Sequence, residues 1–162
     1  MRPPHIETYC KESDYVFVSI FHSEQERTEN IRLASFLGEK MGDVVYLLPH
    51  IQPTQKEASK LRNEFFPKGV KDNKNPDFYF RGRFVDGKSM LETSPKDRKV
   101  TKRIIQNRLR KAFFQAEDAL LEIPTTFPRG WVEGAIRGKQ KSSNNHHVIY
   151  VKYGDEMLVF NG

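Results

Sequence analysis

Residues 75–88 read NPDFYFRGRFVDGK. Two runs rich in aromatic and β-branched residues, 77–80 and 83–88, flank the pair Arg81-Gly82. Such runs favour β-strands, and a short connection that contains glycine favours a hairpin turn. The sequence therefore predicts two antiparallel strands joined by Arg81-Gly82, with Asp77 at the start of the first strand and Asp86 near the end of the second.

The residues before this hairpin predict a strand, a helix and a second strand. Residues 15–21 read YVFVSIF, which is typical of a strand, and residues 44–48 form a short apolar run closed by Pro49. Between them, Ile31, Leu33, Ala34 and Leu37 recur at helical spacing, and the helix is expected to end at Gly38 or Gly42. Residues 56–65 predict a further short helix. The order strand, helix, strand indicates an α/β arrangement.

The residues after the hairpin alternate in the same way. A long helix is expected from Lys99, a strand at 119–123, a short helix at 131–137, a basic polar loop to residue 145, and a hairpin formed by 148–153 and 157–160. We expect a single α/β domain over residues 1–162, with a mixed central β-sheet flanked by helices. Residues 1–13 are expected to be irregular.

The composition limits the class of protein. A length of 162 residues suits one domain, and the single cysteine, Cys10, cannot form an internal disulfide. The chain has no apolar run long enough for a membrane helix and no signal-peptide pattern at its N-terminus. We therefore expect no membrane partner and a cytoplasmic site of action. The net charge of +6 favours polyanionic partners such as nucleic acid.

Asp77, Asp86 and Lys88 form a chemically coherent set on the predicted hairpin. Neighbouring antiparallel strands lie about 4.7–4.9 Å apart, and residues two positions apart on a strand share a face. Carboxylate oxygens suit Mg²⁺ or Mn²⁺, an ion of this kind polarises a phosphoryl group, and a lysine can orient water or stabilise negative charge. The alternative is an ordinary solvated face with weak ion pairs.

Several short motifs in this region resemble a known family. Leu47-Leu48-Pro49, residues 76–82 and Phe84-Val85-Asp86-Gly87-Lys88 are similar to the core motifs of PD-(D/E)XK nucleases. The pattern most resembles the C-terminal tRNA-nuclease domains of bacterial contact-dependent growth-inhibition toxins and related phage-borne domains. It extends over roughly residues 30 to 160 as separate motifs, with Gln115-Ala116 before an apolar strand. The resemblance implies a restriction-endonuclease-like fold.

The resemblance also implies roles for individual residues. Asp77 and Asp86 would bind Mg²⁺ or Mn²⁺, and Lys88 would assist catalysis. The family often has a glutamate on the first helix, for which Glu29 is preferred over Glu26; the alternative for Glu29 is a favourable interaction with the helix dipole. Two departures, Gly87 within the acid-x-lysine motif and Asp86 in place of glutamate, leave room for an inactive relative.

Basic residues form two predicted nucleic-acid contacts. Helical spacing places one set on the face opposite the apolar stripe of the long helix, and a second set lies in the basic loop that follows. Solvated helix and loop surfaces are the alternative. The residues are Lys99, Lys102, Arg103 and Arg110 in the helix, with Arg137 and Lys139 in the loop.

Taken with the resemblance, the sequence predicts a metal-dependent endonuclease that acts on tRNA or other structured RNA in preference to DNA. A toxin effector of this kind would be delivered into cells or encoded on a mobile element, and an acidic immunity protein would be its partner. One alternative is a non-catalytic nucleic-acid-binding module with a degenerate nuclease fold. Another is a metal-independent RNase that uses His146 or His147.

Overall fold

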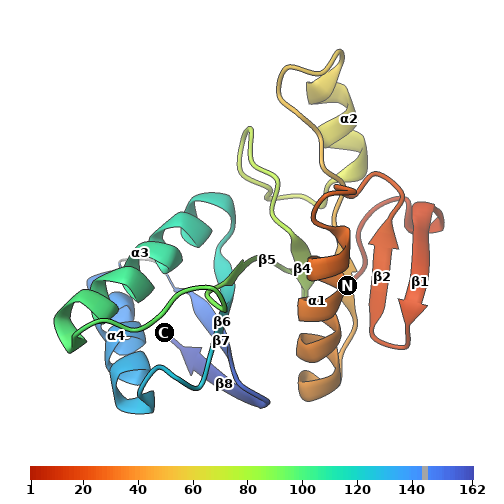
Figure 1. The fold of residues 1–162 in the computed structure, drawn as a ribbon. Helices are drawn as coiled ribbons and strands as arrows, with labels where there is room; N and C mark the ends of the chain where they lie inside the picture. Colours follow the sequence, from red (N-terminus) through yellow and green to blue (C-terminus); the bar gives the residue numbers. More distant parts are fainter. Residues whose placement is uncertain (144–145) are drawn as a thin grey trace. The chain divides into compact units, whose positions relative to one another are not determined.

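The computed structural model describes residues 1–143 and 146–162. The chain divides into two compact units, Met1–Val85 and Asp86–Gly162. Each is an α/β layer with its own helices and strands (Figure 1).

The first unit combines a helix-linked parallel strand pair with antiparallel neighbours. Strands β2 and β3 are parallel, whereas β1 pairs with β2, β3 with β4, and β4 with β5 in the antiparallel sense. Helix α1 connects β2 to β3 and packs on both of them. The elements are the 3-10 turn η1 (Ile6–Thr8), β1 (Tyr9–Ser13), β2 (Val16–Ser19), α1 (Arg27–Met41), β3 (Val45–Leu47), α2 (Ala58–Phe65), β4 (Phe78–Phe80) and the start of β5 (Arg83–Ser89).

Helix α1 follows the apolar stripe and ends at a glycine. Its buried face includes Leu33, Ala34 and Leu37, together with Asn30 and Gly38. The C-cap is Gly42, whose φ of 69° lies in the left-handed region that glycine adopts without strain. The amide of Gly42 donates to the carbonyl of Gly38. The helix therefore ends where the sequence predicts.

The β4–β5 hairpin has the predicted turn. Arg81 and Gly82 have φ values of 52° and 75°, and a positive φ at both central residues is characteristic of the tight turns that match the twist of paired strands. Phe80 pairs with Arg83, and Phe78 pairs with Val85. The predicted hairpin is confirmed.

The second unit repeats the combination of a parallel pair and an antiparallel hairpin. Strands β6 and β7 are parallel, and β7 pairs with β8 antiparallel. Helices α3 and α4 pack against each other, and α3 also packs on β6. The core contains Met90, Ile105, Leu121, Val132 and Ile149 among others. The elements are α3 (Arg98–Gln115), β6 (Asp118–Ile123), α4 (Arg129–Ser142), β7 (Val148–Tyr153) and β8 (Glu156–Asn161).

The predicted α/β class, with mixed strand pairing and flanking helices, is confirmed. Two local predictions are wrong. Residues 6–13 are not irregular, because they form η1 and β1. The helix predicted at 131–137 is longer, and α4 extends to Ser142, so Arg137 and Lys139 lie on a helix rather than in a loop. The remainder of that predicted loop includes residues 144 and 145, which lie outside the described residues.

No helix within residues 1–143 and 146–162 combines the length and the apolar character needed to cross a bilayer.

Tyr9 on β1 provides a test of packing in the first unit. Its ring meets Tyr46 edge-on at 5.9 Å, and burial raises the pKa of its hydroxyl well above the ordinary value. Among residues 1–143 and 146–162 this hydroxyl has no hydrogen-bond partner. An unsatisfied buried polar group costs about 1–3 kcal/mol, so Tyr9→Phe should raise the free energy of unfolding by about 1 kcal/mol in urea titrations.

A matched tyrosine should respond in the opposite direction. The hydroxyl of Tyr153 donates to the carbonyl of Phe127 at 2.6 Å. Tyr153→Phe removes this hydrogen bond, so the free energy of unfolding should fall by about 1 kcal/mol. Equal losses for Tyr9→Phe and Tyr153→Phe would contradict the assignment of an unsatisfied hydroxyl at Tyr9.

Candidate functional site

Asp86 and Lys88 lie together on β5 in the second unit. Asp86 is buried, with 3% of its surface exposed, and the Lys88 ammonium lies 3.0 Å from Asp86 Oδ2. The two residues are separated by one position, so their side chains share a face of the strand, as the sequence predicts. A carboxylate removed from water requires a compensating charge or hydrogen bonds, and Lys88 supplies the charge.

Gly87, between them, does not interrupt the strand. β5 continues through Gly87 to Ser89, and Gly87 is not among the residues with positive φ. The spacing that places Asp86 and Lys88 on one face is therefore retained despite the missing side chain at position 87.

Asp77 lies in the first unit, immediately before β4. Its carbonyl oxygen accepts a hydrogen bond from the amide of Leu48 at 3.0 Å, which extends the contact between the chain after β3 and the start of β4. Its carboxylate Oδ1 accepts from Asn30 Nδ2 at 3.4 Å. Asn30 is buried near the start of α1, so this helix orients the Asp77 side chain.

His22 completes a buried polar chain with Asn30 and Asp77. The His22 Nδ1 lies 2.6 Å from the carbonyl oxygen of Leu48, and Nε2 lies 3.1 Å from Asn30 Nδ2. A carbonyl can only accept, so Nδ1 carries the proton, and Nε2 accepts from Asn30 in the neutral ring. Asn30 thereby donates one hydrogen to His22 and the other to Asp77.

Burial lowers the pKa of His22, although the carbonyl of Leu48 and the charges of Asp77 and Glu26 oppose this shift. His50 adds slightly to the lowering. Because the unfolded chain then binds the proton more readily, the stabilisation by neutral His22 is complete above the unfolded pKa of about 6.5 and is lost as pH falls through the folded value.

The free energy of unfolding should therefore decrease between pH 7.5 and pH 5.5. Urea titrations across this range measure the decrease. His22→Gln, which cannot gain a proton, is the control and should show a shallower dependence on pH. A wild-type slope that His22→Gln reproduces would mean that other groups titrate instead.

Arg62 on α2 holds the segment that leads to Asp77. Its guanidinium is buried and donates to the carbonyls of Ile51 and Lys71 and to Asn75 Oδ1, at 3.2–3.3 Å, and also to the carbonyl of Lys74. Asn75 in turn accepts from the Ile51 amide at 2.9 Å and donates to the Ile51 carbonyl. These bonds fix the Asn75-Pro76-Asp77 segment against the chain that follows β3.

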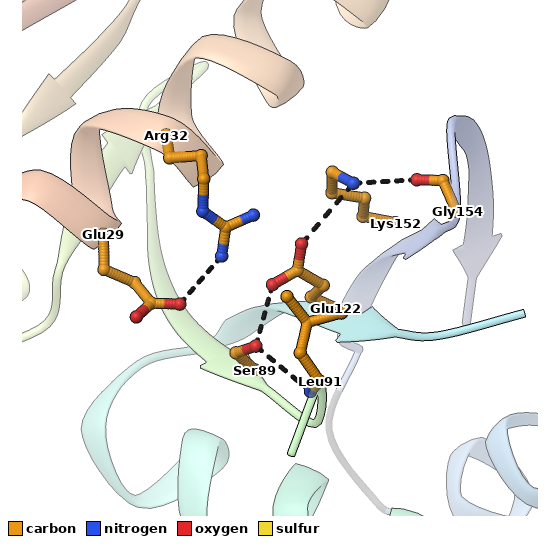
Figure 2. A network of polar contacts seen from close by, with 7 residues as sticks. All are labelled: Glu29, Arg32, Ser89, Leu91, Glu122, Lys152 and Gly154. Carbon is orange, nitrogen blue, oxygen red and sulfur yellow. Dashed lines mark hydrogen bonds and ion pairs between the residues drawn. The ribbon is translucent and has the colours of Figure 1, made fainter. Parts of the chain in front are cut away.

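Glu29 lies in the first turn of α1 and pairs with Arg32, whose Nη2 is 2.8 Å from Glu29 Oε1 (Figure 2). Its side chain is about half exposed. Within the first unit, the α1 side chain bonded to Asp77 is that of Asn30 rather than Glu29. A catalytic role for Glu29 stays a prediction.

A second buried acid, Glu122 on β6, has its own polar network (Figure 2). Ser89 Oγ donates to Glu122 Oε1 at 2.7 Å, and the Lys152 ammonium lies 3.4 Å from Glu122 Oε2. Lys152 also donates to the carbonyl of Gly154. Glu122 and Lys152 are register partners in the parallel β6–β7 ladder. Their charges therefore neutralise each other inside the second unit.

Sequence reasoning missed His22, Asn30 and Glu122. Asn30 had a usable signal: residues 30, 33, 34 and 37 follow helical i, i+3, i+4, i+7 spacing, so a polar residue occupies a position on the buried stripe. Glu122 also had a usable signal in the sequence, because it is a charged residue within the otherwise apolar run of residues 119–123. The predicted set itself divides between the units, with Asp77 in the first and Asp86 and Lys88 in the second.

The predicted nucleic-acid-binding residues are on the two helices of the second unit. Lys99, Lys102, Arg103 and Arg110 on α3 are exposed. Arg137 on α4 is also exposed, with its guanidinium over the Phe160 ring at 5.3 Å, whereas Lys139 is half-buried. The exposed basic face of α3 is confirmed, and its role stays a prediction.

The donor chemistry of the predicted metal ligands suits a hard cation. Mg²⁺ prefers oxygen ligands and usually takes one or two carboxylates while it keeps several waters, so two aspartates are sufficient protein ligands. Across residues 1–143 and 146–162, no three His, Cys, Asp or Glu side chains gather closely enough to hold an ion. The Lys88 ammonium lies 3.0 Å from Asp86 Oδ2, so a cation bound to the same carboxylate would be repelled by the ammonium charge.

The chain was compared with known proteins. No protein-family model matches it, and no curated protein and no solved structure matches it either.

Proposed function

We propose that this protein is a metal-dependent endonuclease that hydrolyses phosphodiester bonds in RNA, with tRNA or another structured RNA as substrate. The observation that carries the proposal is the Lys88 ammonium 3.0 Å from the buried carboxylate of Asp86. A buried acid with an amine beside it is the arrangement that phosphoryl chemistry needs for charge stabilisation.

The β4–β5 hairpin supports including Asp77 in the same chemistry. Within the first unit, Phe78 pairs with Val85. Asp77 precedes Phe78 directly, and Asp86 follows Val85 directly. Asp77 and Asp86 are thus the sequence neighbours of two paired residues, and this hairpin spacing is the basis on which the sequence predicts a shared cation.

Each residue has a distinct part in the proposal. Asp77 and Asp86 would hold Mg²⁺ or Mn²⁺, which, when bound, polarises the phosphate and lowers the pKa of bound water. Lys88 neutralises charge that develops on the phosphate, and Asn30 keeps the Asp77 carboxylate in a fixed orientation. Exposed cations of α3 neutralise backbone phosphates and would make affinity depend on salt.

A toxin role is part of the proposal. Acting on RNA inside a target cell requires that the protein be delivered there or be encoded on a mobile element, and a producing cell must be protected. An acidic immunity protein that covers the basic face of α3 fits the charge of that surface.

The test is cleavage of labelled tRNA by the intact protein in Mn²⁺ or Mg²⁺ and in EDTA. We expect cleavage with metal, none in EDTA, and loss of cleavage in Asp77→Asn and Asp86→Asn. Asp118→Asn changes another buried acid of the second unit, one that accepts from the Val148 amide, and serves as a control for general destabilisation. Cleavage that persists in EDTA would favour the metal-independent RNase instead.

A second candidate is a nucleic-acid-binding module without turnover. It is favoured by the same ion pair, because Lys88 already neutralises Asp86 without a metal. Tight, salt-dependent tRNA binding without cleavage in any divalent metal would support this candidate and overturn the first.

A further inference from the structure

A cavity in the second unit lies between the C-terminal ends of α3 and α4. Its volume is about 290 Å³, near the lower end of the range for small-ligand pockets. It therefore suits one compact group rather than an extended ligand. The lining residues are Arg110, Phe113 and Phe114 of α3, Lys139 and Ser142 of α4, Ser143, and His147 just before β7.

The polar lining has the chemistry of a phosphate site. Arg110 and Lys139 contribute positive charge from two different helices, and no acidic side chain is among the lining residues. Ser142 and Ser143 also line the cavity, and the Ser142 hydroxyl donates to the carbonyl of Lys139. Arginine and lysine side chains are groups that contact phosphate oxygens in nucleic-acid complexes.

His147 adds an oriented ring to the cavity. Only 8% of its surface is exposed, and its ring stacks on Phe113 with centroids 3.8 Å apart and planes 10° from parallel. The carbonyl of Glu117 accepts a hydrogen bond from Nδ1, which assigns the proton to that nitrogen. Nε2 has no hydrogen-bond partner within residues 1–143 and 146–162, and it is the ring nitrogen that a ligand can use.

Phe114 adds an exposed aromatic surface at the same place. It is 56% exposed. A nucleobase can stack on an exposed aromatic ring of this kind. To reach the ring, the base must not be paired with another base. Cations for a phosphate beside an aromatic ring for a base indicate a nucleotide rather than a bare anion.

We propose that this cavity binds one nucleotide of a single-stranded or looped RNA segment, with Arg110 and Lys139 on its phosphate and Phe114 against its base. The inference rests on the proposed function, since it assigns the place where the RNA substrate is held, but the contact itself requires no metal.

The test is titration of the intact protein, in EDTA, with the four nucleoside 5′-monophosphates and with ribose 5-phosphate. Calorimetry measures the affinities, and NMR monitors the signals of the His147 ring. At least one nucleotide should bind about tenfold or more tightly than ribose 5-phosphate, because of the stacking contribution, and should shift the His147 signals. Arg110→Gln/Lys139→Gln should weaken binding at least tenfold.

Matched variants separate a specific site from general attraction. Lys111→Gln/Lys141→Gln removes two charges from the same helices at exposed positions that do not line the cavity, and binding should be unchanged. Phe114→Ser should weaken nucleotide binding about tenfold without affecting ribose 5-phosphate. Phe21→Ser, at an exposed phenylalanine of the first unit, should have no effect.

Several outcomes would overturn the inference. Equal affinity for nucleotides and ribose 5-phosphate would mean a simple anion site. Equal loss in both double variants, or full competition by polyglutamate, would mean nonspecific attraction or an acidic protein partner. Failure of the nuclease proposal is distinct, because it would appear as absent cleavage while nucleotide binding and its dependence on Phe114 persist.

Discussion

Lys88→Met should reduce the single-turnover rate of metal-supported RNA cleavage about 10²–10³-fold, the usual cost of removing one group that stabilises transition-state charge. The affinity for RNA should change little, because the Lys88 charge is already engaged by the Asp86 carboxylate at 3.0 Å. Cleavage rates at saturating RNA and binding measured in EDTA report the two effects separately. The expected pattern is a loss in kcat with almost no loss in binding.

Lys99→Met is the matched control. Lys99 is exposed on α3, so its loss should weaken RNA binding and reduce the salt dependence while leaving the rate at saturating RNA unchanged. An unfolding curve is needed for Lys88→Met, because the buried Asp86 loses its cation. If Lys88→Gln and Lys88→Met both fold and cleave at the wild-type rate, Lys88 has no part in catalysis.

The parts of the fold that could be predicted from sequence depend on local chemistry. The β4–β5 hairpin follows from strand-forming residues on both sides of Arg81-Gly82, whose backbone adopts the positive φ values that such turns need. Helix α1 follows from its apolar stripe and from Gly42. In each case neighbouring residues suffice, and no distant contact has to be known.

The elements that were missed or predicted too short lack a clear local signal. Helix α4, predicted only over 131–137, contains Gly130, Gly134 and Gly138, and each glycine in a helix costs about 1 kcal/mol relative to alanine. The helix forms because it packs on α3: a Cβ at Gly138 would lie 3.0 Å from Gln106 Nε2. Strand β1 was missed because its middle three residues are exposed and give no alternating pattern.

The candidate site likewise combines a contact set by neighbouring residues with contacts set by the tertiary fold. Asp86 and Lys88 share a face because strand residues two apart always do, so their contact could be predicted. The polar chain from His22 through Asn30 links residues eight positions apart and then reaches Asp77, 47 positions further along the sequence. Spacing alone cannot reveal such a chain, although a polar residue on the buried stripe of α1 was a signal that something had to satisfy it.

Arg62→Met should lower the free energy of unfolding by about 3 kcal/mol or more, because the buried guanidinium donates to four acceptors and a hydrogen bond from a charged donor contributes about 1.5–3 kcal/mol. Methionine fills similar space but donates no hydrogen bond. The carbonyls of Ile51 and Lys71 and the Asn75 Oδ1 would each lose the charged donor and keep a neutral one, which is Asn75 Nδ2, the Lys74 amide and the Ile51 amide in turn. Urea titrations measure the change.

Matched variants show whether the geometry of the guanidinium is what matters. Arg62→Lys keeps the charge but loses the fork of donors that reaches several acceptors at once, so it should recover only part of the stability. Lys60→Met, at an exposed position of the same helix, should change stability by less than about 0.5 kcal/mol. Because Asn75 lies two residues before Asp77, Arg62→Lys should also reduce any activity that depends on Asp77 while RNA binding through α3 persists. Wild-type stability for Arg62→Met would mean that the loop before β4 is held by other contacts.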